Sequence, residues 1–267
     1  MQYVSDDFKK CVDPANLFDN VSKLDGEVFR ELENRKTIRF ECAGKGYFAK
    51  THMGIGWVEV IKNLAQFRLP VLGAANEWFA LKRLETLGVD TLTPVAFTSR
   101  GYNPANVQSC IVTRELENTT SLEDLWAETD VSVELKRKLI DKLAKTTRQL
   151  HENGVNHRDY YLCHYLLDMS TISDQSPTVY LIDLHRAQVR KVTPNRWKIK
   201  DVGGLFFSSF NIGLTKRDVF RFMEIYSGKS LRVTLDEDKG FWRETFSRAK
   251  RLYLQNEAKL PAWISSF

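Results

Sequence analysis

The stretch GVNHRDYYLCHYLL, from Gly154 to Leu167, concentrates residues that can transfer protons and bind charged groups. Asp159 is a carboxylate that can accept the proton of an attacking hydroxyl. Arg158 beside it either binds an anionic group or pairs with a nearby carboxylate. The side chain of His157 is expected to pack under such a loop rather than to contact a substrate. The apolar residues that follow indicate a short strand. The stretch is either a solvated turn or the working loop of an enzyme, and its surroundings decide between the two.

A second aspartate, Asp183, follows the next apolar segment in TVYLIDLH. A long helix, then HRD, a short strand, a polar turn and LIDLH is an order that resembles the protein-kinase fold. That resemblance implies Asp159 as the general base and Asp183 as a ligand of Mg²⁺. Phosphoryl transfer needs both, because metal neutralises part of the phosphate charge of ATP while the base holds the acceptor hydroxyl in line.

The first part of the chain provides an independent check on that interpretation. Kinases hold the α- and β-phosphates with a lysine on the third strand, and a glutamate on the following helix orients this lysine. YFAK ends on Lys50, at the end of the third expected strand, and Glu77 lies in the first turn of the next expected helix. An exposed strand lysine and a helix-starting glutamate are each common alone, but their order here favours an ion pair.

Two features depart from the kinase pattern. No glycine-rich loop joins the first two expected strands. The equivalent turn is LENRK, where either Asn34, Arg35 and Lys36 contact phosphate with their side chains or nucleotide binding is weaker. His164 stands where kinases have the asparagine that holds a second metal. Neutral histidine can ligate a metal or hydrogen-bond either aspartate, but it is a poorer Mg²⁺ ligand than an oxygen.

Hydrophobic patterning supplies the elements that would position these residues. Residues 28–50 read as short strands with a turn at Gly44–Gly46, and the next helix has Trp78, Leu81 and Leu84 on one face. Two more strands are expected in TPVAFTSRG and QSCIVTREL. The first 117 residues therefore read strand-strand-strand-helix-strand-strand.

The pattern changes between Glu117 and Ser121. Ser121 and Asp124 resemble a capping pair before a helix, a long amphipathic helix follows, and helices dominate from Pro194 on. The predicted class is α+β, a bilobal protein-kinase-like fold. Residues 1–117 would form a small N-terminal lobe with the nucleotide-binding sheet and one helix. Residues 118–267 would form a mainly helical C-terminal lobe with the catalytic loop and the metal site.

Composition narrows the class of protein and of partner. An apolar fraction of 43% in 267 residues predicts a folded globular chain. The net charge of +5 suits an anionic partner, such as a nucleotide, nucleic acid, acidic glycolipid or membrane surface, although a simply soluble protein can carry it as well. The four cysteines contain no CxxC pair and so no disulfide or metal signature, which favours a reducing compartment.

Targeting signals are equally sparse. The beginning of the sequence does not resemble a signal peptide. The longest uncharged stretch, about residues 202–215, is shorter than the roughly 18 residues that span a bilayer, so any membrane association is expected to be peripheral.

The departures from the kinase pattern point to one subfamily. GVNHRDYYLCHYLL with LIDLHRAQ and RWKIKD resembles the WaaP/RfaP-type kinases of bacterial lipopolysaccharide biosynthesis, as do GYFAKTHMGIGW, LPVLGAANEW and FNIGLTKRD. The similarity runs from about Glu27 to Leu254. It implies a Gram-negative cytoplasmic enzyme, peripheral at the inner membrane, that uses ATP and Mg²⁺ to phosphorylate the first heptose of the lipopolysaccharide inner core. The resemblance alone also implies acyl carrier protein as a possible partner, and no nucleic-acid partner is expected.

Cations near the two aspartates are candidates for binding an anionic acceptor. Arg186 and Arg196 follow Asp183, and Arg158 precedes the expected base; the alternative is a solvated basic turn.

The sequence leaves two other classes of protein as alternatives to a lipopolysaccharide kinase. A protein kinase acting on Ser, Thr or Tyr would share the lysine, glutamate and aspartates, but no A-P-E-like anchor follows Asp183. A non-catalytic pseudokinase scaffold would fit the missing glycine loop, but it has no need of all four residues.

Overall fold

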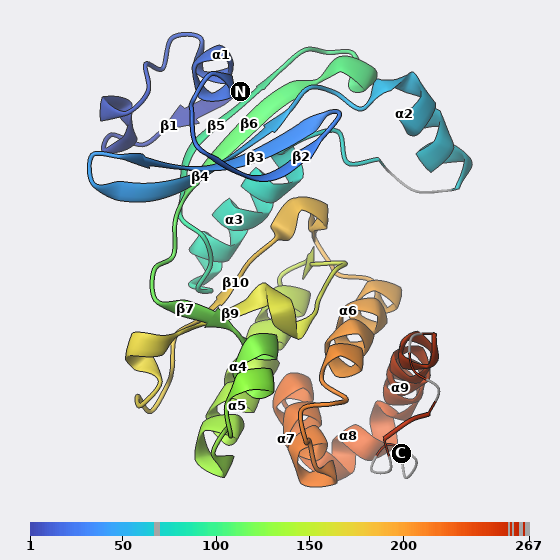
Figure 1. The fold of residues 1–267 in the computed structure, drawn as a ribbon. Coiled ribbons are helices and arrows are strands. Elements are labelled where there is room, and N and C mark those ends of the chain that lie inside the picture. Colours follow the sequence, from blue (N-terminus) through green and yellow to red (C-terminus); the bar gives the residue numbers. More distant parts are fainter. Residues whose placement is uncertain (67–69, 256, 258, 262–263, 265–267) are drawn as a thin grey trace. The chain divides into compact units, whose positions relative to one another are not determined.

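The computed structural model describes residues 1–66, 70–255, 257, 259–261 and 264, and the chain forms two compact units (Figure 1). The first unit contains residues 1–83, 92–116 and 184–186, and the second contains residues 84–91, 117–183 and 187–267. The expected domain limit at residue 117 stays a prediction, since each unit also takes segments from the other half of the chain.

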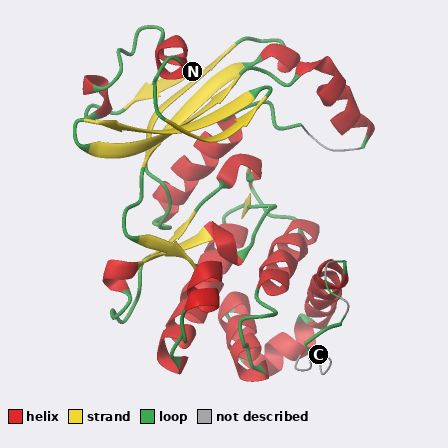
Figure 2. Ribbon diagram, in the orientation of Figure 1, coloured by secondary structure: helices red, strands yellow, loops and turns green. Residues whose placement is uncertain are grey.

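A six-stranded antiparallel sheet builds the first unit, and its strands are drawn in yellow in Figure 2. The strand order is β1-β5-β6-β4-β3-β2. Its strands are β1 (Gln2–Val4), β2 (Glu27–Leu32), β3 (Arg35–Cys42), β4 (Lys45–His52), β5 (Pro94–Arg100) and β6 (Gln108–Arg114). The helical segments of this unit are η1 (Phe8–Lys10), α1 (Leu17–Ser22), α2 (Gly56–Ala65), η2 (Pro104–Asn106), η5 (Leu184–Arg186) and most of α3 (Ala75–Leu87).

The sequence did not indicate β1, α1 or α2, so the expected order of six elements was incomplete. β1 and α1 are too short for a clear hydrophobic period, and packing against the sheet stabilises such elements. A hydrophobic core joins these segments to the sheet, and it contains Phe8, Leu17 and Phe18 together with side chains of β3 and β4. In α2, by contrast, Trp57 and Val58 are exposed, so its apolar residues do not mark a core.

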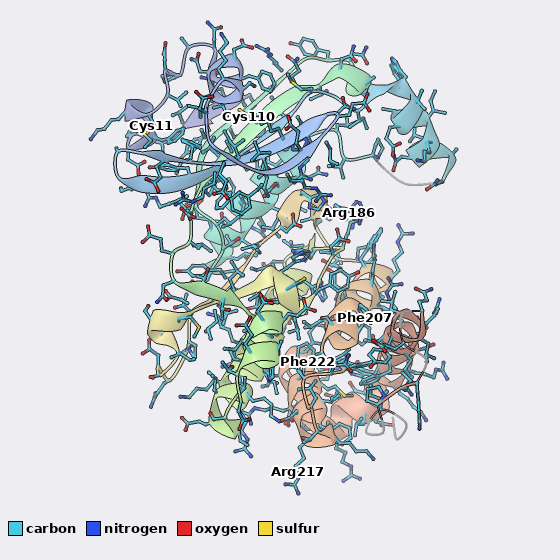
Figure 3. The ribbon with its side chains drawn as sticks, in the orientation of Figure 1. Cys11, Cys110, Arg186, Phe207, Arg217 and Phe222 are labelled. Atoms are coloured by element: carbon cyan, nitrogen blue, oxygen red, sulfur yellow. A yellow bond between two sulfur atoms is a disulfide. The ribbon has the colours of Figure 1, made fainter. Side chains whose placement is uncertain are left out.

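Cys11 and Cys42 form a disulfide, so the expectation that the cysteines carry no disulfide was wrong for this pair (Figure 3 labels Cys11). The two residues are 31 positions apart, and their Cα atoms lie 5.9 Å apart because Phe8 packs against Phe40 of β3. Sequence spacing cannot reveal such a pair. The disulfide also removes the cysteine argument for a reducing compartment.

The turn between β3 and β4 lies at Ala43 and Gly44, one residue before the expected Gly44–Gly46. Both residues have positive φ, 50° and 73°, as a tight hairpin turn requires. Gly46 already belongs to β4. A side chain there would collide with the carboxylate of Glu115, whose backbone N–H donates to the Gly46 carbonyl at 2.9 Å. Gly46 therefore leaves room for the Glu115 side chain and does not form the turn.

Helix α3 packs by the face that its periodicity predicted. Trp78, Leu81 and Leu84 are buried, and Trp78 stacks on Phe97 of β5 with ring centroids 4.9 Å apart. Gly88, with φ of 66°, follows the end of the helix. The first turn of α3, which carries Glu77, is thereby fixed against the sheet.

Helices dominate the second unit, as the sequence predicted, so the α+β class is confirmed. The helices are α4 (Leu122–Glu128), α5 (Val133–Glu152), α6 (Asn195–Ser208), α7 (Lys216–Ser227), α8 (Leu231–Glu237) and α9 (Lys239–Leu254). The short segments are β7 (Thr119–Ser121), β8 (Val155–Asn156), η3 (Leu162–His164), β9 (Tyr165–Asp168), η4 (Met169–Thr171), β10 (Val179–Leu181) and β11 (Gln188–Val189). Ser121 caps α4 as expected, since its hydroxyl accepts from the Asp124 N–H at 3.0 Å.

Aromatic side chains join three helices of this unit. Phe206 of α6 stacks on Phe246 of α9, with centroids 5.0 Å apart, and meets Phe222 of α7 edge-on at 5.2 Å. Phe206 is 3% exposed. Each ring buries a large apolar area, so these contacts fix α6 between its neighbours.

We expect Phe206→Ala to lower the free energy of unfolding by about 3–5 kcal/mol, because it removes a buried ring and leaves a cavity. Urea denaturation of the full chain measures this change. Phe79→Ala is the control, since Phe79 is 52% exposed, and its effect should stay within about 0.5 kcal/mol. Equal effects of the two variants would contradict the assignment of Phe206 to the core.

Candidate active site

The loop that carries Asp159 is tightly constrained. It leaves α5 through Gly154, whose φ is 78° and where a Cβ would collide with the carbonyl of Arg190. Arg158 also has a positive φ, 79°, which is unusual for a residue with a side chain. Such strain persists only where surrounding contacts enforce it, and it is common at functional sites. Asp159 itself is half-buried.

Asp201 of α6 enforces this backbone. Its Oδ2 accepts the N–H of His157 at 2.6 Å, and its Oδ1 accepts the N–H of Arg158 at 2.8 Å. His151 of α5 places Nε2 3.5 Å from the same carboxylate, and its Nδ1 lies 2.8 Å from the Tyr226 hydroxyl. The carboxylate is 1% exposed. The two oxygens therefore hold the backbone N–H groups of the two residues that precede Asp159.

Asp201 was not among the site residues expected from the sequence, although it ends RWKIKD, one of the stretches that resemble the family. A signal existed: the aspartate opens the apolar run DVGGLFF of α6, and buried carboxylates need donors. Only the fold shows that the donors are the backbone of the HRD segment.

His157 packs under the loop, as its sequence context favoured. Its Nε2 donates to the carbonyl of Ile182 at 2.9 Å, and burial lowers its pKa, so the ring is neutral. The bond links the Asp159 loop to the residue before Asp183. His157 therefore aligns the two segments that carry the two aspartates.

His164 contacts both of these segments. Its Nδ1 donates to the backbone carbonyl of Asp159 at 2.7 Å, and its Nε2 lies 3.6 Å from Oδ2 of Asp183. In the tautomer that carries its proton on Nδ1, the Nε2 lone pair of His164 faces a carboxylate oxygen of Asp183. Asp183 adopts a positive φ of 59°. Two electron-pair donors facing each other are suited to sharing a cation.

These two side chains can supply part of a metal site. Within the described ranges, no group of three or more His, Cys, Asp or Glu side chains is arranged to hold a metal. Mg²⁺ commonly takes one or two protein ligands and completes its shell with substrate phosphates and water. The donor set of Asp183 and His164 therefore fits a metal that arrives with a nucleotide, although nitrogen is the weaker of the two ligands.

Lys50 and Glu77 form an ion pair in the first unit. Lys50 Nζ donates to Glu77 Oε1 at 2.6 Å, and the two side chains are 14% and 1% exposed. Among the described residues, Glu77 Oε2 has no hydrogen-bond partner. The contact expected from the spacing is present. The use of Lys50 in holding phosphates stays a prediction.

Only part of the LENRK turn shares the face of the sheet that carries Lys50. Residues opposite each other in an antiparallel pair share a face, and Arg35 lies opposite His52, two residues beyond Lys50. Lys36 lies opposite Thr51, on the other face. Asn34 is in the turn itself, and its carbonyl accepts the N–H of Met53 at 3.0 Å.

The pKa of His52 indicates positive charge on the face of the sheet that carries Lys50. Burial lowers its pKa to about 3, with further lowering by Arg35, Lys50 and His185. His52 is therefore neutral, and its cationic neighbours Arg35 and Lys50 favour the binding of a phosphate.

The three arginines expected at the acceptor belong to different units, and their role in binding the acceptor stays a prediction. Arg186 belongs to η5 and to the first unit (Figure 3). Arg158 and Arg196 belong to the second unit, and the guanidinium carbon of each lies 5.3 Å from the centre of the Trp197 ring.

Comparison with known proteins identifies relatives along nearly the whole chain. The family model described as "Lipopolysaccharide kinase (Kdo/WaaP) family" matches residues 19–226. The chain is 46% identical to a protein named lipopolysaccharide core heptose(I) kinase WaaP from Escherichia coli K12, over 91% of this chain and 94% of that one. A protein of the same name from Pseudomonas aeruginosa is 45% identical, over 92% and 93% of the two chains.

A solved structure agrees with these matches. The structure titled "WaaP in complex with acyl carrier protein" superposes with a TM-score of 0.80 at 39% identity and covers 95% of this chain and 99% of that chain. The family resemblance and the kinase-like fold expected from the motifs are thereby confirmed. In the described part of the chain, no helix has the length and apolar character needed to cross a bilayer.

We expect Asp201→Asn to lower the free energy of unfolding by about 1–3 kcal/mol, because the amide would turn a donor toward the backbone N–H groups that the carboxylate accepts. Hydrogen–deuterium exchange at the amides of His157 and Arg158 should become faster. Asp174→Asn, at an exposed carboxylate, is the control. Unchanged protection of the two amides would show that Asp201 does not hold the loop.

Proposed function

The chain belongs to the lipopolysaccharide kinase (Kdo/WaaP) family, and on this premise we propose that it transfers the γ-phosphoryl group of ATP to the first heptose of the lipopolysaccharide inner core. The observation that carries the proposal is the loop of Asp159, whose backbone is held by the buried carboxylate of Asp201. Kinase catalysis consists mostly of positioning, and a rigid loop around a half-buried carboxylate suits it.

Asp159 is assigned as the general base. A sugar hydroxyl has a pKa far above 7, so the carboxylate takes its proton late, as the new bond to phosphorus forms. The bond from His164 Nδ1 to the Asp159 carbonyl supports this role, because it restrains the main chain at that residue.

Asp183 and His164 would hold Mg²⁺ that arrives with ATP, and the metal would neutralise part of the phosphate charge. Lys50, oriented by Glu77, would bind the phosphates. Arg35 supports phosphate binding in place of a glycine-rich loop, since it shares the face of Lys50. Asn34 could add its side-chain amide from the turn, whereas Lys36 is the weakest of the three candidates because it lies on the opposite face.

The two rival classes have less support. A pseudokinase scaffold needs no buried ion pair between Lys50 and Glu77, yet the pair is intact. A protein kinase is disfavoured because the relatives that match most of the chain are named for a lipopolysaccharide acceptor. That acceptor is a membrane glycolipid, so we place the enzyme in the cytoplasm, peripheral at the inner membrane.

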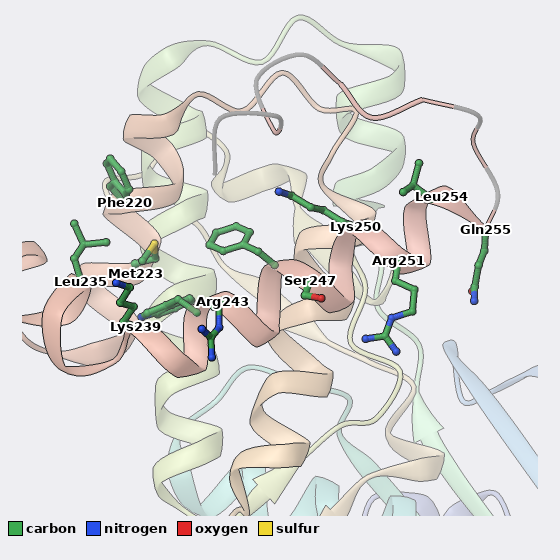
Figure 4. A pocket seen from close by; sticks show the side chains of 12 residues that line it. Phe220, Met223, Leu235, Lys239, Arg243, Ser247, Lys250, Arg251, Leu254 and Gln255 are labelled. Atoms are coloured by element: carbon green, nitrogen blue, oxygen red, sulfur yellow. The ribbon is translucent and has the colours of Figure 1, made fainter.

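Acyl carrier protein is proposed as a partner on two grounds. The related solved structure contains that partner. A pocket of about 890 Å³ lies at α9, and α7 and α8 contribute Phe220, Met223 and Leu235 to it (Figure 4). Further apolar walls come from Trp242 and Phe246, which suits an acyl chain. The same pocket is lined by four cations of α9: Lys239, Arg243, Lys250 and Arg251.

For the transfer reaction, we expect Asp159→Asn to lower turnover on purified lipopolysaccharide core by at least about a hundredfold, because the proton acceptor is lost. ATP affinity should barely change. Label from γ-³²P-ATP on the core, measured beside added protein substrates, separates a heptose kinase from a protein kinase. Near-normal turnover of the variant, matching that of Asp174→Asn, would remove Asp159 from the mechanism. No transfer by the unaltered protein would support the scaffold.

For the partner, we expect the double variant Arg243→Glu with Arg251→Glu to weaken binding of acyl carrier protein that bears a long acyl chain by about tenfold. The loss should be larger at low salt, because attraction between opposite charges is then screened less. Titration calorimetry measures this. Lys216→Glu with Arg217→Glu changes the same charge on exposed residues of α7 and should have no effect. Equal affinity for carrier protein with and without its acyl chain would argue against the pocket.

A further inference from the structure

Trp197, in the first turn of α6, is surrounded by four cationic side chains. The charged groups of Arg158, Arg196 and Lys200 lie 5.3, 5.3 and 5.4 Å from the centre of its ring, and that of Arg190 lies 5.7 Å away. We call this set the Trp197 cluster. A single cation over an indole is an ordinary contact, but four around one ring concentrate positive charge in a small volume.

Neutral groups hold Arg190 in place without cancelling its charge. Its Nη1 donates to Asn156 Oδ1 at 2.7 Å, and its Nη2 donates to Gln188 Oε1 at 2.5 Å. Asn156 is fully buried, and it pairs with Gln188 in the β8–β11 ladder. An amide orients a guanidinium but leaves its full positive charge, so Arg190 is positioned to attract an anion.

Arg158 brings a buried cation to the cluster. It is 8% exposed, and Asp201 accepts its backbone N–H, so its main chain is fixed. Burial and the neighbouring Arg196 both lower the pKa of Arg190. Like charges repel each other, and a bound anion would lower the electrostatic cost of holding these cations around one ring.

Trp197 itself offers a further donor. Its Nε1–H is buried and has no hydrogen-bond acceptor within the described part of the chain. An indole N–H can only donate. A ligand rich in acceptor oxygens would satisfy it together with the guanidinium groups.

We propose that the Trp197 cluster is a binding site for an oxyanion, a phosphate or carboxylate group, that the acceptor glycolipid carries. The assignment to the acceptor rests on the proposed function, whereas anion binding itself does not. Arg158 precedes Asp159 directly in the chain, so an anion held there restrains the acceptor beside the catalytic loop. Two oxygens of one phosphate or carboxylate match the fork of an arginine, which explains why three of the four cations are arginines.

Anion binding is tested on the full chain labelled with 5-fluorotryptophan, with inorganic phosphate as the probe. The ¹⁹F resonance of Trp197 is identified by its loss in Trp197→Phe. We expect phosphate, but not chloride at equal ionic strength, to shift this resonance saturably and to leave the other five tryptophans unmoved. A shift that never saturates, or that chloride reproduces, would overturn the site.

Variants in which glutamine replaces a cation distinguish phosphate binding by the Trp197 cluster from attraction by the overall charge of the protein. Arg190→Gln with Arg196→Gln should raise the Kd for phosphate at least about tenfold, in line with hydrogen bonds to charged groups. Lys216→Gln with Arg217→Gln removes the same charge from exposed positions of α7 and should leave Kd unchanged. Arg196→Gln alone, at an exposed residue, guards against misfolding of the double variant and should raise Kd by a smaller factor. The same Kd in all variants contradicts the proposal.

The source of the anion is tested with three acceptors: native core, core with its carboxylates reduced to alcohols, and core treated with phosphatase. The double variant should raise the KM for native core about tenfold while kcat changes little. With the acceptor that lacks the recognised group, the double variant and the unaltered protein should have the same KM. If the unaltered protein transfers no phosphate while its Trp197 resonance still responds, the proposed function fails and the anion site stands. If transfer is normal and KM is unchanged in the double variant, the acceptor assignment fails.

Discussion

The buried carboxylate of Asp201 is the constraint on which the polar architecture of the second unit depends. A charge removed from water costs several kcal/mol unless donors surround it. Here the donors are two consecutive peptide groups, with His151 close by and Tyr226 behind it. Because those peptides must face Asp201, the positive φ of Arg158 is enforced. The base and the anion site that we propose therefore depend on the same anchor.

The first unit solves a similar problem with a different pair. Glu77 is almost fully buried, and its charge is tolerated because Lys50 donates to it from the neighbouring strand. The pair exists because α3 packs by Trp78 on the sheet, which brings its first turn to β4. Since the second carboxylate oxygen has no partner among the described residues, Glu77 can accept a further donor.

The net charge of +5 is unevenly distributed, and its local concentrations carry the functional information. One concentration is the Trp197 cluster, where amides orient a guanidinium without neutralising it. Another lines the pocket at α9, where four cations accompany apolar walls. Both suit anionic partners, but the first offers forked hydrogen bonds to a small group, whereas the second combines charge with room for a chain. The two sites therefore fit different ligands.

The sequence alone determined the α+β class, the capped start of α4, the buried face of α3 and the family, because each depends on local spacing or on contiguous motifs. It also indicated Lys50 with Glu77, since the kinase order predicts which strand and helix meet. It indicated Arg158 and Arg196 as candidate anion-binding residues, but not that they meet at Trp197. Nor did it indicate the disulfide of Cys11 or the anchoring role of Asp201. These depend on residues that are distant in the chain and become neighbours only when helices and strands pack, so no period or short motif encodes them. Tertiary structure alone decided which polar groups share a buried environment.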